Sequence, residues 1–245
     1  NYISYSGILG STNTNDNGPT IPGLQIADTA GGAYMGVIAC LSALISRQST
    51  GKGQKVDVSM LDSILPLMSL QFAQEWSNIP LSPFKGESEE NTKNVLTGKM
   101  ANYNIYKCAD GKYLALGALE PKFWYKFCEM VDRPEWKNAV FSPEIDQKQL
   151  YQDVLAIFMS KSREQWLKIA ENFDICLSPV YDVSDIENDP QIQFRSMITE
   201  QEHPAYGKIK GLGIPIKFSG SPTELFCPPP ILGENTEEIL KEIGM

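Results

Sequence analysis

The sequence predicts a mixed α/β fold in which a compact central unit is flanked by segments that do not complete a domain on their own. Long apolar runs of helical length alternate with short segments rich in β-forming residues. The composition, 42% hydrophobic, 10% aromatic and 21% charged, is typical of a folded globular chain. A length of 245 residues allows one large domain or two small ones.

The first 60 residues alternate loop, helix and strand patterns. Residues 10–23 are mostly Ser, Thr, Asn, Gly and Pro, which favour turns. Residues 30–48 form an apolar run long enough for a helix, and Gly51 and Gly53 are expected to end it. At residues 56–60 apolar and polar side chains alternate, which predicts a short strand with one buried face.

The central part is predicted from local turn and helix-start residues. A helix is expected at 61–76, and the prolines and acidic residues of 80–90 indicate a linker. The β-rich segments 103–108 and 113–119 are joined by a turn that contains Asp-Gly, which predicts a hairpin. Pro121 then fits the first turn of a helix.

The remaining third of the chain contains fewer recognisable elements. Helices are expected at 147–160 and 163–172, and a strand at 176–183. The segment that follows is predicted to be loop, up to a short helix at 236–243.

Charge and cysteine content exclude several classes of function. A formal net charge of −9 opposes attraction to nucleic acid or anionic lipid, so no nucleic-acid partner is expected. The five cysteines contain no C-x-x-C pair, so neither a zinc site nor a dense disulfide framework is indicated. A reducing, cytoplasmic setting is expected.

Neither a membrane span nor a signal peptide is expected. The longest apolar stretch, residues 33–45, is shorter than the about 20 residues that a bilayer requires, and is interpreted as a buried helix. Residues 1–9 lack a basic segment followed by an apolar one.

Asp28 is the first candidate for chemistry. It stands directly before the long apolar helix, and Gly31 and Gly32 follow in the first turn. Backbone N–H groups there could face a ligand, and the glycines allow another chain or a cofactor to approach closely. An N-cap aspartate that only stabilises the helix is the alternative.

Glu120 is the second candidate, because it lies where a predicted strand ends and a helix begins. A carboxylate favoured by the helix dipole is the alternative. Asp57 and Asp62 are interpreted as solvated or capping residues.

His203 is the only histidine, and it lies before Pro204 in a polar, loop-like stretch. A Ser-His-Asp triad or a His-rich metal site is therefore disfavoured, because each needs an imidazole close to its partners, and His203 is interpreted as a solvated loop residue. The glycines at residues 51 and 53 follow a helix instead of preceding one, which indicates a helix end and not a phosphate loop.

Several motifs in a fixed order resemble the class III coenzyme A transferase superfamily, which also contains α-methylacyl-CoA racemase. The N-terminal matches are residues 1–7, Ala27-Asp28 with Gly31-Gly32, and 49–62. Residues 103–113 and 117–124 resemble the small domain of the racemase branch, and 230–240 resemble the closing helix of the family.

This resemblance implies an incomplete Rossmann-like large domain, a smaller α/β domain, and two chains interlocked in a homodimer. The implied domains are part of the large domain at 1–60, a linker helix and loop at 61–92, the small domain at 93–180, and a linker with a C-terminal segment that returns to the large domain at 181–245. Acyl-CoA and carboxylic acids are the implied substrates, with no permanently bound cofactor and no metal.

The resemblance also implies roles for individual residues. In the transferase branch Asp28 would attack an acyl-CoA thioester and then carry CoA as an aspartyl thioester. In the racemase branch Asp28 would be one of two acid/base groups, Glu120 would partner the second base, and Tyr103 would line the pocket. Gly31 and Gly32 are the implied substrate contacts.

Two departures from the family pattern leave three hypotheses open. The Gly-His-Asp segment of the racemases and the upstream half of the large domain would precede Asn1, so the sequence is interpreted as a fragment. The glycine-rich loop of typical transferases is replaced by residues 96–101, which are closer to the racemase pattern. CoA transferase, acyl-CoA racemase and a catalytically incomplete fragment or interaction module are the hypotheses.

Overall fold

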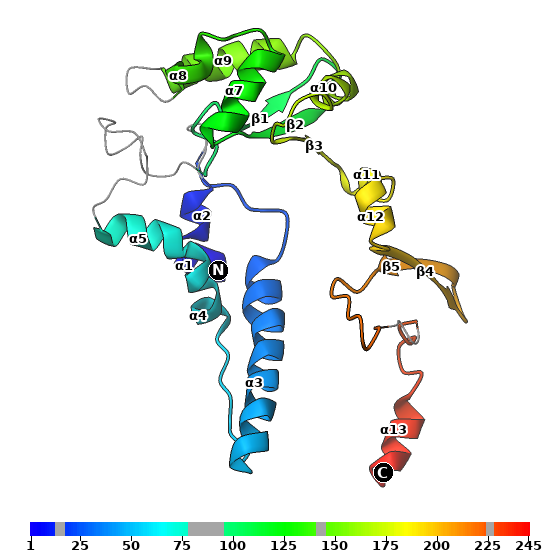
Figure 1. Ribbon diagram of the computed structural model, residues 1–245. Coiled ribbons are helices and arrows are strands. Elements are labelled where there is room, and N and C mark those ends of the chain that lie inside the picture. The colour runs from blue at the N-terminus through cyan, green and yellow to red at the C-terminus, as the bar shows by residue number, and fades with distance from the viewer. Residues whose placement is uncertain (13–17, 78–95, 141–145, 224–227) are drawn as a thin grey trace. The chain divides into compact units, whose positions relative to one another are not determined.

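The computed structural model describes residues 1–12, 18–77, 96–140, 146–223 and 228–245. They form two compact units, Asn1–Val180 and Tyr181–Met245 (Figure 1). Helices and antiparallel sheets both occur, which confirms a mixed helix and sheet structure. The linker predicted at 80–90 lies outside the described residues.

The N-terminal part of the first unit is helical. Its elements are α1 (Tyr2–Tyr5), α2 (Ile8–Ser11), the π-helix η1 (Ala27–Tyr34), α3 (Met35–Thr50), α4 (Met60–Ile64), the 3-10 helix η2 (Leu65–Met68) and α5 (Ser69–Ser77). The helices predicted at 30–48 and 61–76 are therefore confirmed, although each contains a second type of helical turn. Gly51 ends α3 with a φ of 70°, as expected for a glycine at a helix end.

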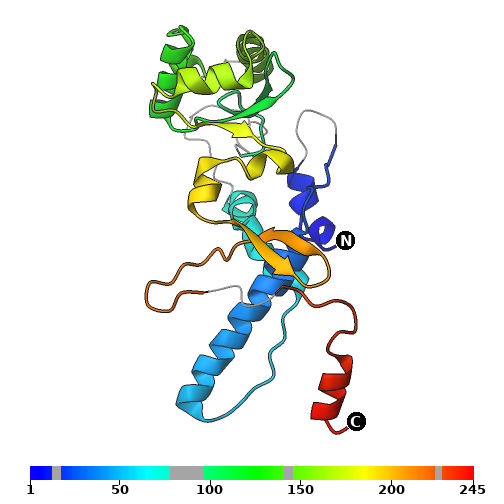
Figure 2. The ribbon, with the colours of Figure 1, turned by 90° about the vertical axis from the view of Figure 1, so that its right-hand side faces the viewer.

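The strand predicted at 56–60 is wrong. Residues 52–59 run back along α3 as a segment without regular structure, and α4 begins at Met60 (Figures 1 and 2). A strand needs a neighbouring strand for its backbone hydrogen bonds. Among the described residues no such neighbour pairs with 52–59, so the alternating pattern alone does not produce a strand.

Helix α3 is exposed along its length, so its interpretation as a buried helix is wrong for this chain. None of its residues is buried, and its large apolar side chains face solvent, with Ile45 67% exposed. With η1 it forms a continuous helical segment, Ala27–Thr50, which by length and composition alone could cross a membrane. The core helix of a soluble protein passes the same test.

A three-stranded antiparallel sheet begins the second part of the unit. Its strands are β1 (Tyr103–Lys107), β2 (Tyr113–Gly117) and β3 (Leu177–Val180), in the order β1-β2-β3. The predicted hairpin is confirmed, and Gly111 takes the positive φ of 80° that its turn requires. Tyr106, Leu114 and Leu116 are buried on one face, whereas the alternate residues of β1 and β2 lie on the other.

The helices that cover the buried face are started by recognisable cap residues. They are α7 (Pro121–Met130), α8 (Trp136–Ala139), α9 (Gln147–Phe158) and α10 (Arg163–Ala170). Asp146 accepts hydrogen bonds from two backbone N–H groups at the start of α9, and Ser162 forms a capping box with Gln165 at the start of α10. Pro121 stands at the first position of α7, as predicted.

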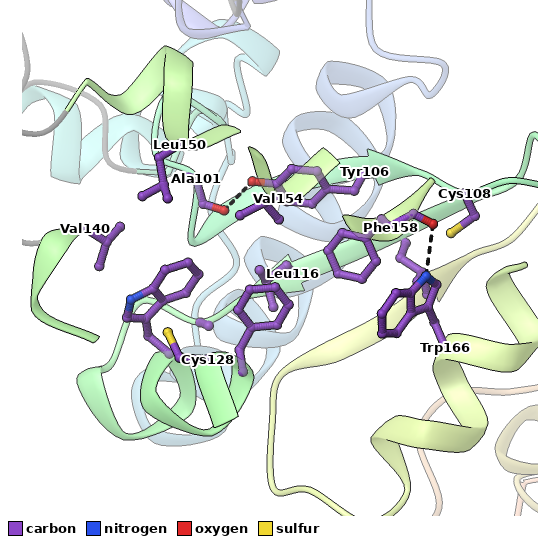
Figure 3. Packing of buried hydrophobic residues seen from close by; sticks show 14 residues of the cluster. Ala101, Tyr106, Cys108, Leu116, Cys128, Val140, Leu150, Val154, Phe158 and Trp166 are labelled. Atoms are coloured by element: carbon purple, nitrogen blue, oxygen red, sulfur yellow. Dashed lines mark hydrogen bonds between the residues drawn. The ribbon is translucent and has the colours of Figure 1, made fainter. Parts of the chain in front are cut away.

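The core between this sheet and its helices is rich in aromatic residues (Figure 3). Phe158 is fully buried, and its ring contacts those of Tyr106, Phe127 and Trp166. The polar atoms of these rings are satisfied as well: the Tyr106 hydroxyl donates to the Ala101 carbonyl, and the Trp166 indole donates to the Phe158 carbonyl. Satisfied polar atoms of this kind fix one arrangement of the core.

Burial keeps two thiols of this core protonated. It raises the pKa of Cys108 to about 11 and that of Cys128 to about 12. An unfolded chain loses these protons at lower pH than the folded one, so the free energy of unfolding should fall as the pH rises from about 9 through these values. Urea unfolding curves between pH 8 and pH 11 would measure the loss. A constant midpoint in wild type, or the same loss in Cys108→Ala/Cys128→Ala, would contradict this origin.

The second unit contains a hairpin that the sequence did not predict. Its elements are α11 (Val183–Ile186), α12 (Pro190–Phe194), β4 (Ile198–His203), β5 (Gly207–Leu212) and α13 (Thr236–Glu242). The last helix is confirmed. Strands β4 and β5 pair in antiparallel register from Ile198–Leu212 to His203–Gly207, where a loop was expected.

His203 is buried at the end of β4, so its interpretation as a solvated loop residue is wrong. Its Nδ1 accepts hydrogen bonds from the N–H groups of Ala205 and Tyr206. Its Nε2 lies 2.9 Å from the Pro229 carbonyl oxygen and therefore carries the proton. The imidazole joins the hairpin turn to a distant segment of the same unit, which is a structural role.

Candidate functional site

Asp28 lies in the first turn of η1, with its side chain exposed. It is not the N-cap of the helix: the cap position is Ile26, which already has helical φ and ψ, and the Thr29 N–H donates to the Gln25 carbonyl. The carboxylate makes no hydrogen bond or ion pair with any described residue. A carboxylate without a structural partner is available for chemistry, so the capping alternative is not supported.

The segment that carries Asp28 is a π-helix. In a π-helix the hydrogen bonds close five residues apart, and such turns are rare and occur frequently at functional sites. Ala27, the neighbour of Asp28, is buried in a small core with Ile8, Ile64 and Met68. Burial of one neighbour anchors the turn while the carboxylate faces outward.

Gly31 brings η1 and α4 into direct contact. A Cβ built on Gly31 would lie 2.7 Å from the Met60 carbonyl oxygen and 2.8 Å from the Ile64 side chain. At Gly32 it would lie 3.5 Å from the Met60 side chain, an ordinary contact. The glycines thus permit the close approach of another segment of this chain. Their predicted contact with substrate stays a prediction.

Gly31→Ala is expected to destabilise the packing of η1 on α4 by about 1–3 kcal/mol, because the new Cβ would lie 2.7 Å from the backbone oxygen of Met60, and backbone moves aside less readily than a flexible side chain. Gly36→Ala is the matched control: nothing lies within 4 Å of its Cβ, and alanine should stabilise the helix by up to about 1 kcal/mol. Urea unfolding of both variants measures the difference. Equal effects would mean that the close approach is not tight.

Glu120 occupies the N-cap position of α7, where its side chain is exposed and makes no capping hydrogen bond. Only its backbone carbonyl acts as a cap, accepting from the N–H groups of Phe123 and Trp124. Burial of the Cys176 thiol raises its pKa, and the negative charges of Glu120 and Asp174 raise it further. Glu120 therefore lies near Cys176.

Tyr103 lines a cavity of about 980 Å³ beside the three-stranded sheet β1-β2-β3. In register it pairs with Gly117, and a Cβ on Gly117 would lie 4.0 Å from the tyrosine ring. Ile105, Ala115 and Ser178, one from each strand, line the same cavity. Of the sequence-predicted site residues only Tyr103 lines it; Asp28, Gly31, Gly32 and Glu120 do not.

The cavity residues other than Tyr103 were missed in the sequence. The alternation along each strand would have placed Ile105, Ala115 and Ser178 on one face. It gives no indication of whether that face is covered by protein or open to a ligand. Cys176 was noted only as one of the five cysteines, and it too lines the cavity.

Comparison with known proteins identifies the family. A model of CoA-transferase family III matches residues 1–236. Formyl-CoA:oxalate CoA-transferase of Rhodopseudomonas palustris is 28% identical over 97% of the chain and 60% of its own length. Human alpha-methylacyl-CoA racemase is 29% identical over 100% of the chain and 61% of its own length. The chain thus spans about three fifths of these relatives.

A solved structure shows the same fold. The crystal structure of a CAIB/BAIF family protein from Brucella suis matches with a TM-score of 0.72 at 24% identity, and covers 99% of this chain and 61% of that one. Because the match is almost complete, nearly all of the exposed segment Ala27–Thr50 has a counterpart there. With the family model matching nearly the whole sequence, the chain belongs to CoA-transferase family III.

Proposed function

We propose that the protein containing this chain transfers coenzyme A between carboxylic acids, with Asp28 as the covalent centre. The observation that carries this proposal is the exposed Asp28 carboxylate, which has no structural partner among the described residues and lies on a turn fixed by Ala27 and Gly31. A carboxylate nucleophile needs no activating base, because it is ionised at neutral pH.

The proposed reaction balances without any further reagent. A carboxylate oxygen of Asp28 attacks the thioester carbonyl carbon, the C–S bond breaks, and CoA leaves as the thiolate. The thiolate then attacks the carboxyl carbon of Asp28, releasing the first acid as its carboxylate. The acceptor carboxylate reverses both steps. Each half is a displacement at a carbonyl carbon, with no net transfer of electrons or protons.

The rest of the enzyme is expected to lie outside this chain. The relatives are longer by about two fifths of their length, and in the proposal the additional part supplies the contacts to the CoA nucleotide. The exposed apolar side chains of α3 support such a covering, because an apolar surface of this kind marks an interaction site. The proposed assembly is an interlocked homodimer. In it, the additional part of the large domain and the partner subunit together cover the exposed side chains of α3.

A racemase that moves the proton α to the thioester carbonyl is the second candidate. Human alpha-methylacyl-CoA racemase matches over the full chain. The resemblance stated from the sequence implies racemase-branch roles for Glu120 and Tyr103. In this chemistry Asp28 exchanges a proton with the α-carbon and forms no covalent bond. Both candidates use an exposed Asp28, so the structure of this carboxylate supports either.

Two assays separate the hypotheses, with the longest polypeptide that the reading frame encodes as the enzyme. A transferase should accumulate, with acyl-CoA, a hydroxylamine-sensitive adduct on Asp28, located by mass spectrometry of the digested protein. A racemase should incorporate deuterium at the α-carbon in D₂O without any acceptor acid. Asp57→Asn is the control, because Asp57 is also exposed but lies outside η1. Absence of both results would favour the noncatalytic hypothesis.

A further inference from the structure

The turn that carries Asp28 has one buried face and one exposed face. Ala27 and Gly31 are buried, whereas Asp28 and Thr29 are exposed. A π-helical turn is rare, which indicates that it is not the geometry that a helical segment adopts by itself. Contacts on the buried face are therefore expected to maintain the turn.

Ile64 on α4 is the side chain that lies nearest to the Cβ position of Gly31. Its Cγ2 methyl group is 2.8 Å from the point that a Cβ on Gly31 would occupy, so the methyl group fills the space where a side chain would begin. Ile64 is fully buried, in the same small core as Ala27. The residues before and after Asp28 that face the protein thus both face the core that contains Ile64.

The position of Ile64 is determined by the two ends of its own helix. Helix α4 begins after Ser59, whose Oγ accepts a hydrogen bond from the Asp62 N–H at 3.3 Å. It ends at Ile64, and Pro66 follows in η2, where its missing N–H cannot continue the α-helical hydrogen bonds. Ile64 is therefore the last residue of a short helix whose limits are set locally, which makes it a firm support for η1.

We infer that Ile64 is a positioning residue for Asp28: its Cγ2 methyl group, packed against Gly31, keeps η1 in the geometry that presents the carboxylate to the substrate. The inference rests on the proposed function in taking Asp28 as the reacting group. Ile64 acts only through the turn and touches no substrate. Such positioning has a large effect on rate, because a displacement of about 1 Å can slow a reaction about 10²-fold.

Two substitutions of Ile64 separate this role from a general contribution to stability. Ile64→Leu removes the Cγ2 methyl group but keeps the number of carbon atoms. Ile64→Val keeps Cγ2 and loses only the Cδ1 methyl group. Both are small changes of a buried aliphatic side chain, so their costs in stability, measured by urea unfolding, should be comparable. Ile8→Leu is the matched control, because Ile8 lies in the same small core but on α2.

The kinetic assays use the longest polypeptide of the reading frame. The probes are succinyl-CoA with glutarate as acceptor for transfer, and α-methyldecanoyl-CoA in D₂O without acceptor for proton exchange. Ile64→Leu should lower kcat about 10–100-fold and change KM less than about twofold, because the carboxylate is misplaced while the substrate contacts are unchanged. Ile64→Val and Ile8→Leu should keep kcat within about threefold of the wild type, because both retain the Cγ2 contact with Gly31.

Hydrogen exchange followed by mass spectrometry provides a second measurement, which needs no activity. The backbone amides of residues 27–35 should exchange about tenfold faster in Ile64→Leu than in the wild type, because the turn opens locally more often. Ile64→Val and Ile8→Leu should exchange these amides at nearly the rate of the wild type.

An unchanged kcat in Ile64→Leu would overturn the inference, and so would an equal loss of kcat in Ile64→Val or Ile8→Leu. The proposed function is judged by a different variant: turnover that Asp28→Asn abolishes keeps it, even if Ile64→Leu has no effect. If the wild type shows no turnover that depends on Asp28, the proposed function fails, and hydrogen exchange then decides the role of Ile64. Faster exchange at 27–35 in Ile64→Leu alone supports that role, and equal exchange in all the variants overturns it.

Discussion

Replacing Asp28 by asparagine in the longest polypeptide of the reading frame should abolish covalent transfer of CoA and reduce α-proton exchange by about 10²–10⁴-fold. Asparagine keeps the size and exposure of the side chain but cannot attack a thioester or take up a proton at neutral pH. The η1 turn should be unaffected, because the Asp28 side chain makes no hydrogen bond within the described residues. Steady-state kinetics and the circular dichroism of both proteins are the measurements.

Asp62→Asn is the control for this experiment. Asp62 is an exposed carboxylate in the first turn of α4, the helix against which η1 packs. Its replacement should leave kcat within about twofold and lower stability by less than about 1 kcal/mol, through the loss of a favourable charge at a helix start. Full activity in Asp28→Asn would eliminate both catalytic hypotheses.

Phe158→Ala should lower the free energy of unfolding of the first unit by about 3–5 kcal/mol. The ring is fully buried and contacts three other aromatic rings, from β1, α7 and α10. Its removal leaves a cavity that these rings cannot all close. Urea unfolding followed by tryptophan fluorescence, with Trp166 as an adjacent reporter, measures the loss.

Met159→Ala is the matched control, because Met159 follows Phe158 directly and is 45% exposed. Its loss should cost less than about 1 kcal/mol, as expected for surface positions. Similar effects of the two substitutions would show that the aromatic cluster is not the main source of stability in the first unit.

The β1–β2 hairpin and helix α7 were predictable because they begin and end with local turn and cap residues. The Asp110-Gly111 turn and Pro121 determine backbone geometry within a few residues, without help from distant parts of the chain. The predictions for residues 52–59 and for the β4–β5 hairpin were wrong for the opposite reason, because strand formation depends on pairing with another segment. The alternation at 56–60 has no partner strand among the described residues. In β4 and β5 the charged pairs Glu200–Lys210 and Glu202–Lys208 conceal the strand pattern.

The candidate site was predictable in its residues and not in its geometry. Asp28 was identified from its position and from the family resemblance, but it was expected directly before the helix, with an N-cap role as the alternative, whereas it lies inside a π-helix. Propensities do not distinguish π from α turns, because the choice depends on packing such as that of Gly31 against Met60. Tyr103 was expected in a pocket and lines one; Glu120 lies near Cys176, outside that cavity.

The π-helical turn also preserves the angular phase between Asp28 and α3. Each residue of an α-helix advances by about 100° around the axis, and a π-helical segment accommodates a residue that α geometry would place differently. Deleting one residue between Asp28 and Met35 should let the turn revert to α geometry, so that the wide turn is lost while Asp28 keeps nearly its present angle to α3. Sequence length in this segment is therefore as much a determinant of the site as the aspartate.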